Sequence, residues 1–271
     1  MRSDVLYEDH RLSLARYDHP RGVPHRDPDR EESQTYAVSF VENGGFSLHH
    51  GGDTWRLSRG ALFVTRPGLR YRCTHDSESP DDVCLSLHCS ADLIEEATAA
   101  VGRTWDDLVP VAPLTNRLAY LHRSLGEAVA GGVAAMAVPS LAAEVVAAIV
   151  GPRPAPRLYR SGQLAWYAKR VDAARDLMER RFAEPLSIET LGREVGVSPF
   201  HFSRVFRDLV GLPPHRYLVR LRLARAAAAL RGGATVTAAA RDCGFPNLGQ
   251  FIRQFRRAHG VTPSRYGRSA K

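Results

Sequence analysis

The chain has 271 residues, of which 44% are hydrophobic, a formal net charge of +8 at pH 7 and four cysteines. This length allows two domains with separate hydrophobic cores, and the cysteines form no disulfide framework or CxxC pattern, which indicates a reduced, cytoplasmic setting. The polar first ten residues exclude an ordinary secretion signal, and the longest apolar stretch, 136–150, is too short to span a bilayer, so we expect no membrane partner.

Residues 1 to about 90 are predicted to form short strands separated by turns. The predicted strands are 12–17, 35–41, 46–50, 55–57, 62–64, 69–75 and 83–89. Alternation in the second of these places Tyr36, Val38 and Phe40 on one face. The sequences 43–45 and 51–53 are Gly-rich hairpin signals. Short strands at this spacing predict a small barrel or sandwich.

From residue 91 the pattern changes to that of helices. Predicted helices occupy 91–101, 114–129 and 136–150, and the second has an apolar stripe along one side. The last two could pair with the same helices of a second chain, so we expect a homodimer; packing on their own barrel is the alternative. The Gly- and Pro-rich sequence 151–156 cannot continue a helix and begins a predicted linker, 151–162.

The region from about 186 to 266 contains one helical unit written twice. Seven residues of the first copy recur in the second, each 49 positions later. Those of the first copy are Phe202, Arg204, Phe206, Arg207, Gly211, Pro214 and Tyr217, and their counterparts are Phe251, Arg253, Phe255, Arg256, Gly260, Pro263 and Tyr266. In each copy a short apolar helix ends near a glycine, Gly196 or Gly244, which can adopt positive φ. A capping residue, Ser198 or Asn247, then begins a second helix. Two helices joined by a tight glycine turn predict a helix-turn-helix in each copy.

Positive charge is concentrated in the same half of the chain. Residues 161–271 contain 20 Lys+Arg and 8 Asp+Glu, a balance of +12, whereas residues 1–160 contain 17 and 21, a balance of −4. This asymmetry indicates one domain that binds a polyanion and one that does not. A solvated, arginine-rich surface is the alternative explanation for the charge alone.

The duplicated region resembles the DNA-binding domain of the AraC/XylS family of transcription regulators. The matching sequences include Gly196-Val-Ser198, Gly244-Phe245 and the two sets of recurring residues, together with Arg222-Leu223. The resemblance implies an α+β protein of two domains. It places a cupin-like β-barrel with helices, for effector binding and dimerisation, at 1–150, and an all-α DNA-binding domain with two helix-turn-helix motifs at 163–271. The likeness of the barrel is weaker, because it depends on the arrangement of strands and on Gly60 and Pro67-Gly68.

In this family each motif places its second helix in the major groove of double-stranded DNA, with the two helices about one DNA turn apart, roughly 34 Å. Carried over by position, the DNA-binding residues are Pro199, Phe200, Ser203, Arg204 and Arg207 in the first copy, and Asn247, Leu248, Gln250, Arg253, Arg256 and Arg257 in the second. Arg204 is the candidate for reading guanine and Gln250 for reading adenine, while Arg207, Arg256 and Arg257 are expected to contact phosphate. Gly249 leaves a gap in the second copy. A solvated helix face is the alternative for each position.

In the barrel, aromatic residues and one histidine are the candidates for effector binding: His25, Tyr36, Phe46, Trp55 and Tyr71. Core packing is the competing explanation for the aromatic ones. The His-x-His…Glu pattern of a metal-dependent cupin is incomplete in 25–31, and Tyr71 stands where a later histidine would be needed, so we expect no catalytic metal and no cofactor.

Two cysteines and two histidines in the predicted strands leave a further possibility open. By alternation Cys73 and His75 share a face, as do Cys84 and His88. Were these strands neighbours, the four side chains could form a soft metal or redox sensor. Buried cysteines and surface histidines explain the same residues.

Taken together, the sequence predicts a sequence-specific transcription regulator, an activator rather than an enzyme, which is dimeric and responds to a small-molecule effector. Its partners would be double-stranded DNA, the effector, a second copy of the chain and, for an activator, RNA polymerase, at the nucleoid in the cytoplasm. Two alternatives remain: a cupin-type metal-dependent enzyme with a DNA-binding appendage, and a constitutive DNA-binding protein whose barrel only dimerises.

Overall fold

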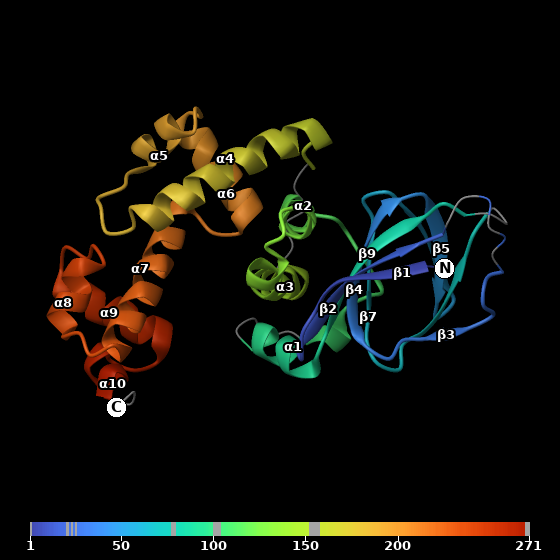
Figure 1. Ribbon diagram of the computed structural model, residues 1–271, viewed down its shortest axis with the longest axis horizontal. Helices are drawn as coiled ribbons and strands as arrows, with labels where there is room; N and C mark the ends of the chain where they lie inside the picture. The colour runs from blue at the N-terminus through green and yellow to red at the C-terminus, as the bar shows by residue number, and fades with distance from the viewer. Residues whose placement is uncertain are drawn as a thin grey trace. The chain divides into compact units, whose positions relative to one another are not determined.

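A computed structural model describes residues 2–19, 22, 24, 26–76, 80–99, 104–151 and 158–268. The chain divides into two compact units, Met1–Leu158 and Tyr159–Lys271. The first combines strands with helices and the second is helical, as Figure 1 shows, so the predicted α+β fold class is confirmed. Half of the predicted linker, 152–157, lies outside the described residues, and the linker's last two positions already belong to a helix.

The first unit contains two antiparallel sheets. The strands are β1 (Arg2–Glu8), β2 (Leu12–Asp18), β3 (Glu31–Glu32), β4 (Tyr36–Asn43), β5 (Gly45–His50), β6 (Asp53–Ser58), β7 (Leu62–Thr65), β8 (Arg70–Thr74), β9 (Val83–Cys89) and β10 (Val111–Ala112). The larger sheet has the order β1-β2-β9-β4-β7-β10 and the smaller one β3-β8-β5-β6. The sheets face each other as a barrel (Figure 1), and residues of both line one cavity.

Alternation along β4 separates the interior of the barrel from its outer face. Ala37 and Ser39 line the cavity, whereas Val38 and Phe40 point the other way, where the Phe40 ring stacks on His122 at 4.7 Å. Both faces of β4 are therefore buried, as its burial pattern shows. Tyr36 lies on the outer face, as its spacing from these residues predicts.

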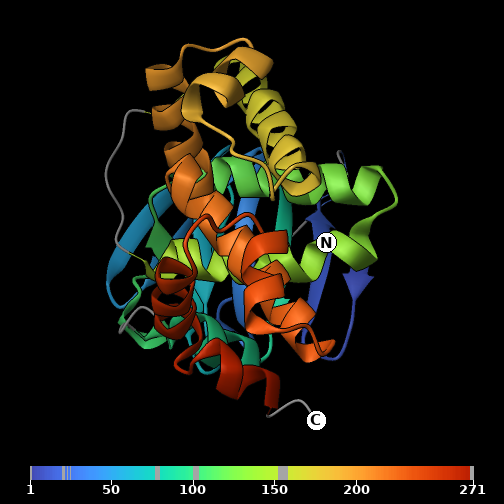
Figure 2. The same ribbon diagram turned by 90° about the vertical axis from the view of Figure 1, so that its left-hand side faces the viewer.

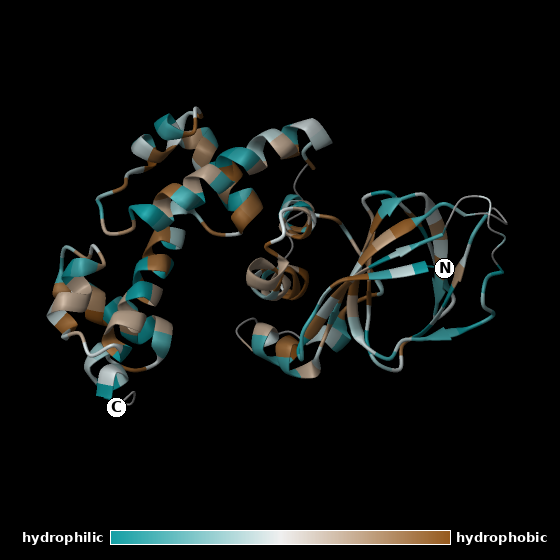
Figure 3. Ribbon diagram, viewed as in Figure 1, coloured by the Kyte–Doolittle hydropathy of each residue, from teal (hydrophilic) through white to brown (hydrophobic). Residues whose placement is uncertain are grey.

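Helices pack beside the larger sheet. They are α1 (Ala91–Thr98), α2 (Asn116–Ala130) and α3 (Ala134–Val150), with a short 3₁₀ helix η1 (Trp105–Asp107) before α2. Helix α3 contacts α1, α2 and β1, and Figure 3 shows that most of its residues are hydrophobic. Val138, Ala142 and Val145 are fully buried there, so α3 packs within its own unit. No helix among the described residues has the length and apolar character needed to cross a membrane.

The second unit consists of helices. They are α4 (Ser161–Arg180), α5 (Ile188–Glu194), α6 (Pro199–Val210), α7 (Pro214–Arg231), α8 (Val236–Asp242), α9 (Leu248–His259) and α10 (Pro263–Arg268). The pairs α5/α6 and α8/α9 are the two helix-turn-helix motifs, and α7 runs between them (Figures 1 and 2). The predicted duplication is therefore present in the fold.

The two copies share their aromatic core. Phe202 and Phe206 lie with ring centroids 5.5 Å apart, and the equivalent Phe251 and Phe255 are also 5.5 Å apart. A tyrosine packs edge-on against the second ring of each pair, at 5.5 Å for Tyr217 and 5.3 Å for its counterpart on α10. These repeated contacts explain why aromatic residues recur at the same offset.

The turns of the motifs follow the predicted glycine pattern, and one of the two predicted caps is present. Gly196 and Gly244 have φ of 69° and 77°, and the turn of the second copy is one residue longer than that of the first. Asn247 caps α9 by accepting a hydrogen bond from the backbone N–H of Gln250 at 2.9 Å. Ser198 makes no such bond at the start of α6, so the capping prediction was wrong there; Pro199 at the first helical position provides the preorganised φ instead.

Candidate functional site

The outer face of α6 carries the residues predicted for the first motif. Pro199, Phe200, Arg204 and Arg207 are exposed, and Ser203 is half-buried. The Phe200 side chain is 82% exposed, which is unusual for a ring of this size. The opposite face of the helix is buried in the aromatic core. The helix therefore presents an apolar ring and two guanidinium groups on one accessible surface.

Arg204 is held in place by a chain of hydrogen bonds. Its guanidinium nitrogen Nη2 lies 3.1 Å from Nδ1 of His201, and Nε2 of His201 lies 2.8 Å from the hydroxyl of Tyr167 on α4. Because arginine can only donate, Nδ1 must accept, which leaves the ring proton on Nε2 to be donated to the tyrosine oxygen. Neither His201 nor Tyr167 was predicted from the sequence, because the hydrogen-bond chain includes a residue on a different helix, Tyr167 on α4.

The surface of α9 differs from that of α6. Leu248, Gln250 and Arg253 are exposed, as are the arginines of its last turns, Arg256 and Arg257. Asn247 is exposed as well, although its side-chain oxygen is engaged in capping. A Cβ added at Gly249 would lie 3.3 Å from that oxygen and 3.6 Å from a guanidinium nitrogen of Arg253. The glycine therefore leaves room for the cap and the arginine beside it.

The arginines of α6 and α9 are not paired with acidic groups among the described residues. Within the described part of the chain, the structure shows no ion pair of Arg204, Arg207, Arg253, Arg256 or Arg257. Arg222 of α7 behaves differently, because it donates to the backbone oxygens of Phe182 and Glu184, each at 2.6 Å. These two bonds tie α7 to the segment that follows α4. Burial lowers the pKa of Arg222.

A cavity of about 320 Å³ occupies the interior of the barrel. Its lining residues are Tyr17, His19, Pro28, Glu31, Ser33, Thr35, Ala37, Ser39, Phe46, Phe63, Thr65, Tyr71, Cys73, His75, Asp82, Cys84, Ser86 and His88. Phe46 and Phe63 form an apolar part, with ring centroids 5.7 Å apart. Hydroxyl, imidazole and carboxyl groups also line a cavity whose surface is mostly apolar, so the cavity is suited to a small, largely apolar ligand with several hydrogen-bonding groups.

Two of the five predicted effector-binding residues lie in this cavity. Phe46 and Tyr71 line it, and burial together with the nearby Glu31 carboxylate raises the pKa of Tyr71. Tyr36 does not line it; its ring meets Trp105 edge-on at 6.0 Å on the outer face. Trp55 on β6 packs against the barrel core and is also outside the lining, and His25 lies outside the described residues.

The two cysteines and two histidines that suggested a sensor all line this one cavity. They approach it from opposite sheets, because β8 pairs with β5 and β3 whereas β9 pairs with β2 and β4. Burial raises the pKa of the Cys84 thiol to about 12 and also raises that of Cys73, which disfavours a reactive thiolate. Neither thiol belongs to a group of potential metal ligands among the described residues.

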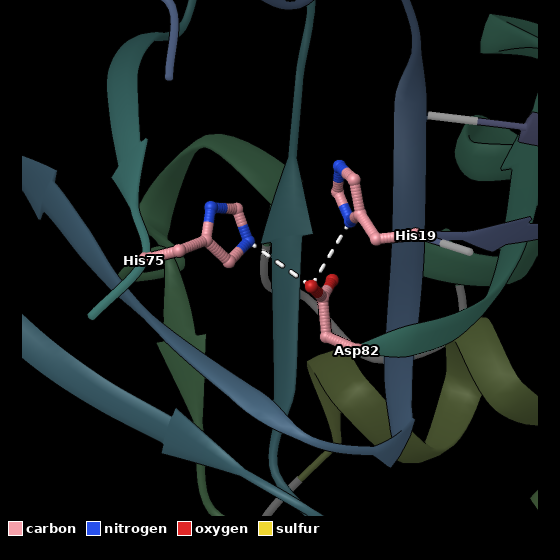
Figure 4. Close-up of side chains that lie close together, drawn as sticks. All are labelled: His19, His75 and Asp82. Atoms are coloured by element: carbon pink, nitrogen blue, oxygen red, sulfur yellow. Dashed lines mark hydrogen bonds and ion pairs between the residues drawn. The ribbon is translucent and has the colours of Figure 1, made fainter. Parts of the chain in front are cut away.

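His75 instead lies beside two residues that the sequence did not single out. Nδ1 of His19 is 3.0 Å from Oδ1 of Asp82, and Nε2 of His75 is 3.1 Å from the same oxygen (Figure 4). His19 follows β2, His75 follows β8 and Asp82 precedes β9. The available signal was their position at strand ends, but pairing of β2 with β9 is needed to bring residues 19 and 82 together, and closure of the barrel to bring residue 75 to them.

Comparison with known proteins matches both units. The family model of the AraC-like ligand binding domain matches residues 15–141, and that of a helix-turn-helix domain matches residues 191–269. The chain belongs to the AraC family of transcription regulators. The resemblance stated from the sequence is thereby confirmed for both units.

Named relatives of this AraC-family chain match it over part of its length. It is 40% identical over 80 residues to the HTH-type transcriptional regulator Rv1931c of Mycobacterium tuberculosis. The aligned residues cover 29% of this chain and 31% of that relative. It is 38% identical over 96 residues to the HTH-type transcriptional activator RhaS of Escherichia fergusonii, 34% of each. The chain thus spans about a third of the length of these relatives.

A solved structure also resembles part of the chain. It is that of a probable AraC family transcriptional regulator from Rhodopseudomonas palustris, 35% identical, covering 38% of this chain and 98% of that one, with a TM-score of 0.36.

Proposed function

We propose that the protein is a sequence-specific DNA-binding transcription regulator whose barrel binds a small-molecule effector. The observation that carries the proposal is the pair of exposed, arginine-bearing helices α6 and α9, built on the same aromatic core and joined by α7. The 18 residues of α7 span about 27 Å at 1.5 Å per residue. A rod of this length is comparable with the roughly 34 Å turn of DNA that separates successive major-groove faces.

The exposed residues have different roles in this proposal. Arg204, positioned by His201, donates two hydrogen bonds from its guanidinium group to the major-groove edge of a guanine. Gln250 binds the major-groove edge of an adenine. Arg207, Arg253, Arg256 and Arg257 neutralise phosphates, and Phe200 and Leu248 contact apolar groups such as a thymine methyl. Because Asn247 already caps α9, its remaining contribution is through the amide N–H₂ group.

The DNA-binding proposal is tested by selecting preferred duplexes from a random pool and measuring affinity against salt. Arg204→Ala should cost about 1–3 kcal/mol on the selected sequence and relax the preference at one or two base pairs. Arg257→Ala should weaken binding to all sequences alike and reduce the salt slope by about 0.9. Arg181→Ala is the matched control, since this exposed arginine pairs with Glu184 outside both motifs.

Two results would contradict the proposal. One is wild-type protein that prefers no duplex over random competitor at moderate salt. The other is an Arg204→Ala variant that loses affinity equally on every sequence, which would make that contact a phosphate contact.

For the barrel, we infer that Phe46 and Tyr71 contact the effector. For the whole chain, we infer a homodimer that activates transcription through RNA polymerase, at chromosomal DNA in the cytoplasm. The cavity supports an effector of limited size with hydrogen-bonding groups. Phe46→Trp should fill part of the cavity and abolish the effector dependence of DNA binding while leaving effector-free binding unchanged. If genome-wide DNA occupancy were the same with and without cell metabolites, the barrel would serve dimerisation only.

A further inference from the structure

We propose that one end of the barrel cavity binds a single divalent transition-metal ion through Nδ1 of His19, Nε2 of His75 and a carboxylate oxygen of Asp82. Two imidazoles and one carboxylate are a donor set that zinc, cobalt and iron(II) accept, with positions left open for water or another ligand. The proposal goes beyond DNA binding and does not depend on it.

The spacing of the donor atoms is close to what such an ion requires. In a tetrahedral site with bonds of about 2.0–2.2 Å, neighbouring donor atoms lie roughly 3.3 Å apart. Two of the three separations are 3.0 Å and 3.1 Å, and all three donor atoms lie within 4.8 Å of one another. Small rotations of the two rings, which face the same carboxylate in Figure 4, would complete the triangle.

The cluster is buried and lies at the ends of paired strands. The side chains of His19, His75 and Asp82 are only 9%, 6% and 8% exposed. The backbone N–H of His19 donates to the backbone carbonyl oxygen of Asp82 at 3.1 Å, which continues the register in which Asp18 pairs with Val83. Ligands from β2 and β9 are thus fixed to each other, and His75 faces them from the smaller sheet.

A second carboxylate orients one of the ligands. Oδ1 of Asp27 lies 2.5 Å from Nδ1 of His75, and Oδ2 accepts the backbone N–H of the same residue at 2.9 Å. The Nδ1–H of His75 is therefore donated to Asp27, which turns Nε2 toward the other two ligands. Histidine ligands of metal ions are commonly held by a carboxylate in this way.

The position of the cluster would expose a bound ion to the cavity. All three ligands are among the cavity-lining residues, so an open coordination position would face the interior. The carboxylates of Asp27 and Asp82, with Glu31 also at the cavity, make this region acidic and favour a cation. Direct hydrogen bonding from both imidazoles to Asp82, without an ion, is the competing explanation of the same geometry.

The test is metal binding by the purified full-length chain after removal of metals with a chelator. Titration with Co²⁺, followed by its visible absorption and by calorimetry, should show one ion per chain, and Zn²⁺ should displace it. Asp82→Asn and His75→Gln should abolish this binding, and Asp27→Asn should weaken it roughly 10- to 100-fold. His122→Gln is the matched control, because His122 also pairs with a carboxylate, Glu42, at 3.1 Å but outside the cavity.

Circular dichroism would show whether each variant is folded, and His19→Gln provides a further ligand variant should one of the others fail to fold. Wild-type protein that binds no Co²⁺ or Zn²⁺ would overturn the proposal, as would variants that bind the ion like the wild type. A sulfur-to-cobalt charge-transfer band would also overturn it, since it would place the ion on a cysteine. None of these measurements uses DNA, so failure here leaves the DNA-binding proposal intact.

Discussion

Alanine substitution at the two turn glycines should destabilise the second copy of the motif more than the first. Gly196 and Gly244 occupy equivalent positions with similar φ, 69° and 77°. A Cβ at Gly196 would have no heavy atom within 4 Å, whereas one at Gly244 would lie 2.4 Å from the backbone oxygen of Ala183 and 2.8 Å from its carbonyl carbon. The two sites therefore share the conformational cost and differ in the steric one.

The magnitudes follow from this difference. An L-residue in the left-handed region costs about 1–2 kcal/mol, and Gly→Ala restores about 0.4–1 kcal/mol by restricting the unfolded chain, so Gly196→Ala should cost about 1 kcal/mol. At Gly244 the contact is with backbone, which cannot rotate away, and overpacking adds about 1–3 kcal/mol. Gly244→Ala should thus cost about 2–4 kcal/mol.

Native-state hydrogen exchange on the full-length chain would measure both effects where they occur, because it reports the opening free energy of individual helices. The amides of α5 and α6 report on Gly196→Ala, and those of α8 and α9 on Gly244→Ala. An equal or smaller loss for Gly244→Ala would refute the argument that contact with Ala183 distinguishes the two turns.

Four further substitutions test other contacts. Asn247→Ala should lower the free energy of unfolding of the second unit by about 1 kcal/mol, whereas Ser198→Ala should leave it nearly unchanged. The reason is that Asn247 makes a capping hydrogen bond and Ser198 does not. Equal thermal unfolding of the two variants would contradict this difference. Phe206→Ala should cost about 3–5 kcal/mol, since its ring is fully buried, and urea unfolding would contradict this if the midpoint stayed in place. The hydrogen bond from His122 lowers the pKa of Glu42. The stabilisation of the folded state by ionised Glu42 is therefore present above the pKa of Glu42 in the unfolded chain and is lost as the pH falls through its lower pKa in the folded chain. Glu42→Gln should flatten the acid side of a plot of unfolding free energy against pH, and an unchanged plot would contradict this role of Glu42.

The features predicted most accurately from the sequence depend on local chemistry. Glycine at positive φ, proline at the first turn and phenylalanine at fixed spacing each specify backbone or packing within a few residues. The two motifs could therefore be derived without coordinates. Predicted strands such as 83–89 also matched because their alternation extends over several residues.

The features that were missed depend on contacts between distant segments. Strand β1 consists largely of exposed residues, and β3 and β10 have two residues each, so none produces a hydrophobic pattern. Alternation correctly divided β4 into two faces but could not say which one encloses the cavity, which is why Tyr36 was included among the effector candidates. Asp82 was overlooked because it belongs to a polar loop in the sequence and to a buried cluster in the fold.

The same limitation applies to the duplicated motif, where sequence similarity conceals a difference in surface chemistry. On the proposal that both helices bind DNA, α6 offers an arginine oriented by His201, whereas α9 uses the oxygen of Asn247 for its own cap and has no side chain at Gly249. An oriented guanidinium loses less conformational entropy when it binds a base edge, so α6 should account for more of the sequence discrimination. The helix α9, with three arginines along its exposed side, would contribute more of the phosphate contact and hence more of the salt dependence.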